Sequence, residues 1–233
     1  MSGTLFGLGL GPGDPELVTP RARLVLRRVA VVAYAAPQSG PSFARSIVAS
    51  LISPALIEIA IRVPMVPERA PAQAVYDAGA DAIARHLDRG TDVAVLCQGD
   101  PFFYGSFIQL FERLASRYRT EVVPGVSSLT ACAAAARVPL AVRDEPLLVL
   151  PAPLAEAELE RRLADTGNAV IIKLGRHFEK VRRILQRLGR ASDAIYVERA
   201  SLATERVLTL DAVDAAAVPY FSLVLLRGRG PRS

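Results

Sequence analysis

The chain has 233 residues, of which 51% are hydrophobic and 22% charged, and its formal net charge is +5. A chain of this length and composition can bury one large core or two modest ones, so we expect a globular protein. No stretch of 18 residues lacks a charged side chain, which excludes a membrane-crossing helix, and the first twenty residues do not resemble a signal peptide, so we expect a cytoplasmic protein.

Strand-like and helix-like segments alternate along the first half of the chain. Thr19 is a typical N-cap residue in front of Pro20, and apolar runs bounded by turn residues are typical of buried strands. The predicted elements are a strand at 4–10, a helix from Pro20, a strand in 29–34, a helix at 70–89, a strand at 92–97 and a helix at 104–117.

A break at residues 118–120 separates this half from a second series of elements. The helix predicted at 176–188 is amphipathic, with its apolar residues on one face. The series comprises strands at 121–123, 147–150, 169–173, 195–198, 207–210 and 221–226, and helices at 127–136, 154–164 and 176–188. The pattern predicts an α/β protein with two abutting α/β lobes, 1–119 and 120–233, and a ligand site in the cleft between them.

The segment Gly7–Pro15, "GLGLGPGDP", has the outline of a nucleotide-binding loop. Its spacing does not fit the dinucleotide motif G-x-G-x-x-G, because either register puts Pro12 or Asp14 in the last glycine position. That motif also needs an acidic residue about 20 positions later, and none occurs between Glu16 and Glu58. A dinucleotide-dependent oxidoreductase is therefore disfavoured, and cofactor titration would test it.

Four turns rich in small residues follow predicted strands. They are Gly9–Asp14, Gln98–Pro101, Pro124–Ser128 and Leu174–Arg176. In open α/β sheets, ligands bind beyond the carboxyl ends of the strands, and glycine there lets the backbone approach the ligand. Two of these turns carry an Asp-Pro pair and one carries adjacent serines, which favours a polar ligand with cationic and hydroxyl groups over a phosphate.

The cysteines and histidines do not indicate a metal site. Cys97 and Cys132 lack metal-binding or disulfide spacing, so we expect two small core residues. His86 and His177 are the only histidines, and a solvated side chain is the favoured interpretation of each.

Most of the positive charge comes from arginine, since Lys173 and Lys180 are the only lysines. Arginine binds carboxylates and phosphates bidentately, so an anionic partner is plausible, although surface arginines often only solvate the protein. A non-enzymatic module that binds anionic ligands or RNA is the alternative. The few aromatic residues are not interleaved with a basic stripe, which argues against nucleic acid, and salt-dependent RNA retention would test it.

Several segments together resemble the tetrapyrrole methyltransferases of cobalamin and sirohaem synthesis over nearly the whole chain. The resemblance is greatest to the branch that methylates precorrin-2 at C20. It rests on "GLGLGPGDPELVT" (7–19), "CQGDPFFYGSF" (97–107), "EVVPGVSSLTACAAAA" (121–136), "KLGRHFEKV" (173–181), "YVERAS" (196–201) and "PYFSLVL" (219–225).

This resemblance implies a methyl donor, S-adenosylmethionine, held between the lobes, and a homodimer. The residue composition adds the expectation that no metal and no membrane take part. The first glycine-rich loop would face the tetrapyrrole, with Pro12 at the floor of the cleft. The donor contacts implied by position are Pro12, Gln98, Gly99, Asp100, Phe103, Ser127, Ser128, Leu174 and Ala200. A capping role for the two serines and an Asp-Pro turn at Asp100 are the structural alternatives.

Two departures from the family pattern bear on the substrate. Tyr34 is followed by Ala35, Ala36 and Pro37, whereas the uroporphyrinogen-methylating branch carries an acidic residue there as its proposed proton acceptor. This disfavours uroporphyrinogen. Gln98 stands where close relatives would be expected to have Glu, which leaves the role of that side chain open.

The implied reaction is an in-line displacement in which C20 of precorrin-2 attacks the sulfonium methyl group. Alignment and exclusion of water would supply most of the rate, and a base must later remove the C20 proton. The sequence leaves four candidates for that base: Asp14, Tyr34, Tyr104 and Tyr220. Arginines that would suit the carboxylates of the substrate are Arg21, Arg45, Arg143 and Arg176. A substrate that carries cobalt is left open.

Overall fold

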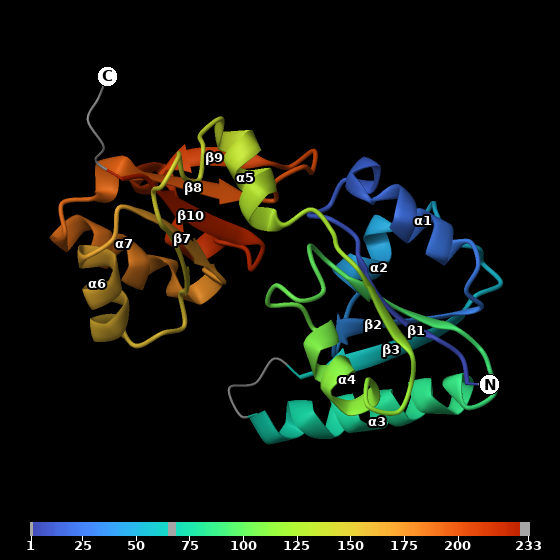
Figure 1. The fold of residues 1–233 in the computed structure, drawn as a ribbon. Coiled ribbons are helices and arrows are strands. Elements are labelled where there is room, and N and C mark those ends of the chain that lie inside the picture. Colours follow the sequence, from blue (N-terminus) through green and yellow to red (C-terminus); the bar gives the residue numbers. More distant parts are fainter. Residues whose placement is uncertain (1, 65–68, 229–233) are drawn as a thin grey trace. The chain divides into compact units, whose positions relative to one another are not determined.

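The computed structural model describes residues 2–64 and 69–228 (Figure 1). The chain divides into two compact units, unit 1 with residues 1–127 and unit 2 with residues 128–233. Each unit is built around its own five-stranded sheet, with helices on both faces.

Unit 1 contains a fully parallel sheet. Its strands, in spatial order, are β3 (Ile57–Val63), β2 (Val31–Pro37), β4 (Val93–Cys97), β1 (Leu5–Gly9) and β5 (Thr120–Val123). Its helices are α1 (Pro20–Leu26), α2 (Phe43–Ile47), α3 (Arg69–Leu87) and α4 (Phe107–Leu114). Because β1, β4 and β5 are neighbours and run the same way, the loops at their carboxyl ends come together at one edge of the sheet.

Alternate residues of these strands pack against helices on opposite faces. Leu5 and Val93 belong to the apolar cluster that contains α3 and α4, whereas Phe6 and Ala94 belong to the cluster that contains α1 and α2. Gly7 lies on the α4 face, where a Cβ atom would stand only 2.5 Å from the Phe107 ring. The central strands β1 and β4 are therefore buried on both sides, as their continuous apolar sequences predict, whereas most residues of the edge strand β3 are not buried.

Unit 2 contains a mixed sheet. Its strands, in spatial order, are β6 (Leu147–Pro151), β7 (Asn168–Ile172), β10 (Ser222–Leu226), β8 (Ala194–Glu198) and β9 (Arg206–Thr209). Only β6 and β7 pair in parallel, and the other neighbours are antiparallel. Helix α5 (Ser128–Ala136) packs on one face, and α6 (Glu156–Ala164) and α7 (Phe178–Arg187) pack on the other.

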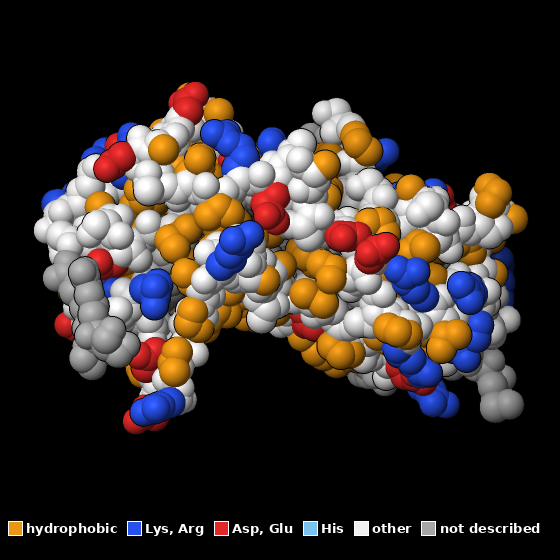
Figure 2. Space-filling view, turned by 90° about the horizontal axis from the view of Figure 1, so that it is seen from above, with side chains coloured by type: hydrophobic (Ala, Val, Ile, Leu, Met, Phe, Trp, Pro, Cys, Tyr) orange, Lys and Arg blue, Asp and Glu red, His pale blue; other side chains and the backbone are white. Residues whose placement is uncertain are grey.

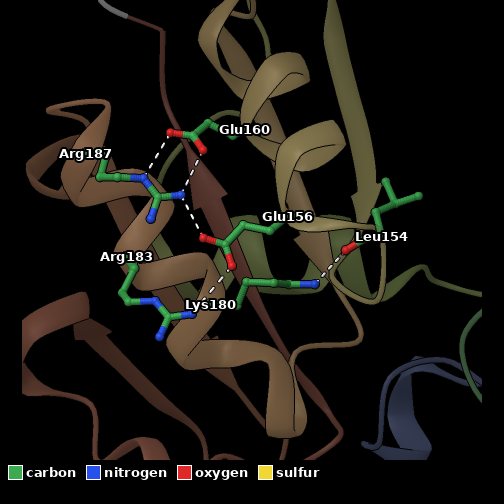
Figure 3. Close-up of polar contacts among 6 residues, drawn as sticks. All are labelled: Leu154, Glu156, Glu160, Lys180, Arg183 and Arg187. Atoms are coloured by element: carbon green, nitrogen blue, oxygen red, sulfur yellow. Dashed lines mark hydrogen bonds and ion pairs between the residues drawn. The ribbon is translucent and has the colours of Figure 1, made fainter.

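An ionic network joins α6 to α7 on the surface of unit 2 (Figure 3). Arg187 donates to Glu156 and to both carboxylate oxygens of Glu160, and Arg183 also reaches Glu156. Lys180, part of the "KLGRHFEKV" motif, donates from Nζ to the Leu154 carbonyl at 2.6 Å. This part of the motif therefore ties α7 to the chain that leads into α6.

Short 3-10 segments connect several elements. They are η1 (Pro15–Leu17), η2 (Gly175–His177), η3 (Ala191–Asp193), η4 (Leu210–Ala212) and η5 (Ala215–Ala217). In the parts of the chain that the structure describes, no helix combines the length and apolar character needed to cross a membrane.

The predicted α/β architecture is confirmed, but two boundaries differ from expectation. Residues 120–123 form β5, which pairs with β1 in the first sheet, so the division falls after residue 127 and not between residues 119 and 120. The predicted helix at 104–117 begins only at Phe107, because Tyr104 has a left-handed backbone (φ 55°) that a helix cannot contain. Helix α2 and strand β3 were not predicted at all.

Candidate active site

Three turns interlock at the carboxyl edge of the unit 1 sheet. The Gly11 amide donates to the Gly99 carbonyl at 3.3 Å, and the Gly99 amide donates to the Gly11 carbonyl at 2.7 Å. A Cβ atom on Gly125 would stand 2.1 Å from the Gly99 carbonyl oxygen, and one on Gly9 would stand 2.3 Å from the Gly125 amide nitrogen. Glycines in the first three predicted turns thus let one backbone touch another.

Asp100 ties the second turn to the third. One carboxylate oxygen accepts from the Phe102 amide at 2.9 Å, and the other accepts from the Gly125 amide at 3.1 Å. The first contact closes an Asx turn, which is the structural alternative that the Asp-Pro pair suggested. A carboxylate has further lone pairs, so these contacts are compatible with a ligand contact as well.

Gly99 faces open space on the side where a side chain would stand. Its backbone is left-handed (φ +66°), and a Cβ atom there would meet no heavy atom within 4 Å. Gln98 and Asp100, on either side of it, are half-buried. Phe103 and Tyr104 follow on the same loop, exposed, with their rings 5.0 Å apart at 89°.

The first loop is almost entirely buried. Pro12 is buried, and Asp14 is half-buried and accepts from the Glu16 amide at 2.8 Å, which caps η1. Asp14, a candidate base, therefore also has a structural role in this loop.

Tyr34 and Arg45 are brought together by Glu58, a residue that the sequence analysis did not select. Tyr34 donates its hydroxyl to Glu58 Oε2 at 2.7 Å, and Arg45 holds both carboxylate oxygens at 2.8 and 2.9 Å. Burial, with the hydrogen bond to Glu58, raises the pKa of Tyr34 above its ordinary value. The Arg45 guanidinium in turn lowers the pKa of Glu58.

The remaining predicted donor contacts lie at the start of α5 and in unit 2. Ser127 and Ser128 are half-buried, and Ser128 is the first residue of α5. Leu174 follows β7 with its side chain fully buried, so only its backbone can face a ligand. Ala200 follows β8 and shares an apolar cluster with Leu129, beside Ser128.

The other substrate-binding and catalytic candidates lie on the surface. Arg21 pairs with Glu121 at 2.9 Å, whereas Arg143 and Arg176 are exposed and form no ion pair with any residue that the structure describes. Tyr220 is 53% exposed and packs edge-on against Phe221.

One face of the molecule carries charged side chains of both signs (Figure 2). On the face drawn in Figure 2, basic side chains are interspersed with acidic ones.

Within residues 2–64 and 69–228, no cluster of three or more His, Cys, Asp or Glu side chains could hold a metal ion. His177 is half-buried. Its pKa is lowered mainly by burial and further by the positive charges of Lys180 and Arg176.

Comparison with known proteins decides the family. A family model described as "Tetrapyrrole (Corrin/Porphyrin) Methylases" matches residues 4–215. A precorrin-2 C(20)-methyltransferase of Sinorhizobium sp is 43% identical over 97% of this chain and 96% of that protein. The chain belongs to the tetrapyrrole methylase family. The resemblance to this family that the sequence motifs indicate is thus confirmed.

A second relative is longer than this chain. The cobalamin biosynthesis protein CobIJ of Mycobacterium tuberculosis is 47% identical over 97% of this chain, but the match covers 46% of that protein. The chain therefore spans about half the length of that relative.

A solved tetrapyrrole methylase shares the fold. The crystal structure of a uroporphyrin-III C-methyltransferase of Thermus thermophilus, complexed with S-adenosylhomocysteine, matches 97% of this chain and 97% of that chain. The TM-score is 0.70 and the sequence identity is 25%.

Proposed function

We propose that this chain transfers a methyl group from S-adenosylmethionine to C20 of precorrin-2 and thereby forms precorrin-3A in cobalamin synthesis. The observation that carries the proposal is the 43% identity to the Sinorhizobium precorrin-2 C(20)-methyltransferase, which extends over both chains almost completely. The Ala35–Ala36 sequence after Tyr34 supports it, because the acidic residue of the uroporphyrinogen branch is missing there.

The residues of the second turn fit the donor. A backbone that is left-handed at Gly99 and open where a Cβ would stand gives a ligand direct access to main-chain atoms. Gly175, beside Leu174, has the same two properties (φ +41°). We propose that Pro12, Gln98, Gly99, Asp100, Phe103, Ser127, Ser128, Leu174 and Ala200 hold S-adenosylmethionine.

When bound, S-adenosylmethionine supplies an electrophilic methyl group on a sulfonium, and its leaving group needs no proton. The chain's own residues then have to align and shield the reactants and accept one proton from C20. Among the four candidate bases, Asp14 caps η1 and Tyr34 donates to Glu58, so we propose Tyr104 or Tyr220 as the base, although burial raises the pKa of Tyr220 above its ordinary value.

The substrate carries carboxylates, and arginine is suited to bind them. Arg143 and Arg176 are the stronger candidates, because Arg45 already binds Glu58 bidentately and Arg21 pairs with Glu121. A cytoplasmic location and a homodimer complete the proposal.

Incubation of the purified protein with precorrin-2 and methyl-labelled S-adenosylmethionine tests the activity. We expect mass spectrometry to detect one added methyl group and NMR to locate it at C20. A parallel reaction with cobalt-precorrin-2 compares the rates of methylation of the cobalt-carrying and the metal-free substrate. Methylation of uroporphyrinogen at C2 or C7, or of precorrin-2 at another carbon, would contradict the proposal.

A further inference from the structure

In the turn between β8 and β9, Ala200 stands between two residues of unusual backbone conformation. Arg199 (φ 52°) and Ser201 (φ 69°), on either side of Ala200, both lie in the left-handed region. Neither is a glycine, so this conformation is unfavourable for them and persists only where surrounding contacts maintain it.

Contacts at the base of the turn anchor it to both strands. Glu198, the last residue of β8, is 3% exposed and pairs with Arg206 across the ladder. Its carboxylate accepts the Tyr196 hydroxyl and lies 3.5 Å from Arg206 Nη1. The Arg199 amide donates to the Phe221 carbonyl at 2.9 Å.

The tip of the turn is closed by a backbone bond, in which the Leu202 amide donates to the Arg199 carbonyl at 3.0 Å, and by the side chain of Glu205. The Ser201 amide donates to Glu205 Oε2 at 2.7 Å, and the Glu205 amide donates to the Leu202 carbonyl at 2.9 Å. Glu205 is exposed, so its carboxylate contributes to this turn and not to the core. The hydrogen bond from the Ser201 amide to Glu205 fixes the peptide group that links Ala200 to Ser201.

Ala200 itself is 5% exposed. Among the residues that the structure describes, none hydrogen-bonds to its backbone amide or carbonyl. Buried peptide groups in folded proteins are nearly always paired, so these two groups are suited to receive a ligand.

We propose that Glu205 is a positioning residue for donor binding: by holding the Ser201 amide, it fixes the Ala200 turn in the conformation that receives S-adenosylmethionine. This inference rests on the proposed function. Fixing the turn before the ligand arrives lowers the entropy cost of binding. Glu205 touches neither the donor nor the substrate in this role.

The test compares Glu205→Ala, Glu205→Gln and the control Thr204→Ala, an exposed residue of the same turn. Calorimetry measures the affinity for S-adenosylhomocysteine. We expect Glu205→Ala to weaken it on the order of tenfold, the effect of losing one hydrogen bond to a charged acceptor. Glu205→Gln, whose amide oxygen can still accept from Ser201, and Thr204→Ala should bind within about twofold of wild type.

Two further readouts separate positioning from general stability. Glu205→Ala should keep the wild-type melting temperature, and its KM for S-adenosylmethionine should rise while kcat at saturating donor stays unchanged. Unchanged affinity in Glu205→Ala, or a loss of affinity that follows a lowered melting temperature, would overturn this inference alone. Wild-type protein that does not bind S-adenosylhomocysteine would overturn the proposed function and this inference with it.

Discussion

The Tyr34 hydroxyl donates to Glu58 Oε2 across 2.7 Å, from β2 to its neighbouring edge strand β3. The tyrosine therefore keeps its proton in the native state, and its pKa is raised by burial and by this bond. A general base contributes about 10²–10⁴-fold to the rate. We expect Tyr34→Phe to lower kcat less than about tenfold, and a larger loss with unchanged KM would restore Tyr34 as a candidate base.

The same pair predicts how stability depends on pH. Folding raises the pKa of Tyr34, so this group stabilises the native state at any pH below the tyrosine pKa of the unfolded chain, which is about 10. This stabilisation is lost as the pH rises through the higher pKa of the folded protein. Wild-type protein should therefore lose more unfolding free energy than Tyr34→Phe as the pH is raised above about 10. Denaturant titrations of both proteins at pH 8 and at alkaline pH measure this, and parallel losses would argue against it.

Gly125→Ala should separate the second and third turns. Its Cβ would stand 2.1 Å from the Gly99 oxygen, so the backbone must move. Overpacking of this kind costs about 1–3 kcal/mol, and we also expect the affinity for S-adenosylmethionine to fall. Gly167→Ala is the matched control, because the nearest atom to its Cβ would be 3.8 Å away. Equal behaviour of the two variants in calorimetry and denaturant unfolding would contradict the interlock.

Gly99→Val should abolish S-adenosylmethionine binding, because a side chain would fill the open space beside the turn. The left-handed backbone at Gly99 also strains a β-branched residue, so loss of stability must be measured separately. Gly99→Asn is the informative companion, since asparagine tolerates this conformation better and still projects a side chain. A stably folded Gly99→Asn protein with wild-type affinity for the donor would contradict the placement.

Arg190 should be among the most sensitive positions in unit 2. It is 8% exposed, and its guanidinium donates to the carbonyls of Thr166, Gly167 and Arg227 and to Asp193. Arg190→Ala removes the donor that these four acceptors share, and we expect a loss of about 3 kcal/mol in unfolding free energy.

Arg187→Ala is the control for that measurement, because Arg187 pairs with acids on the exposed surface (Figure 3). Ion pairs of this kind are screened by solvent, so this variant should unfold almost as wild type does. Similar denaturation midpoints for the two variants would show that the buried arginine is less important than its contacts indicate.

Both thiols should be inert in the native protein. Cys97 and Cys132 are buried, and burial raises the pKa of each to about 12, so almost no thiolate exists at pH 8. At pH 8, a thiol reagent should react with neither cysteine in the native protein and with both cysteines after denaturation. Rapid native modification of either cysteine would mean that its core opens locally.

The sequence pattern predicted most of the elements because their apolar residues follow the period of the structure they form. Strand β3 was missed although Ile57, Ile59, Ile61 and Val63 alternate with polar or small residues, a typical strand signal. Helix α2 has only five residues, too few for a helical period to be visible. The sheet to which β5 belongs depends on pairing with β1, which no local pattern encodes.

The candidate site was predicted only in part for the same reason. The four turns were located by their glycines, and each follows a strand as expected. Partners between distant segments were not visible: Glu58 meets Tyr34 only once β3 lies beside β2, and Glu205 meets Ser201 only within a turn that contains no glycine. The sequence indicated where the backbone bends, and tertiary contacts decide what each bend holds.

The position of β1 also matters for how the protein is made. This first strand lies between β4 and β5, so both of its edges pair with segments that leave the ribosome much later. Until residue 123 has emerged, the nascent chain carries an apolar strand with at least one unpaired edge, which is the kind of surface that aggregates or recruits chaperones. Completion of the parallel sheet, and with it of the three interlocked turns, is thus a late event in the synthesis of unit 1.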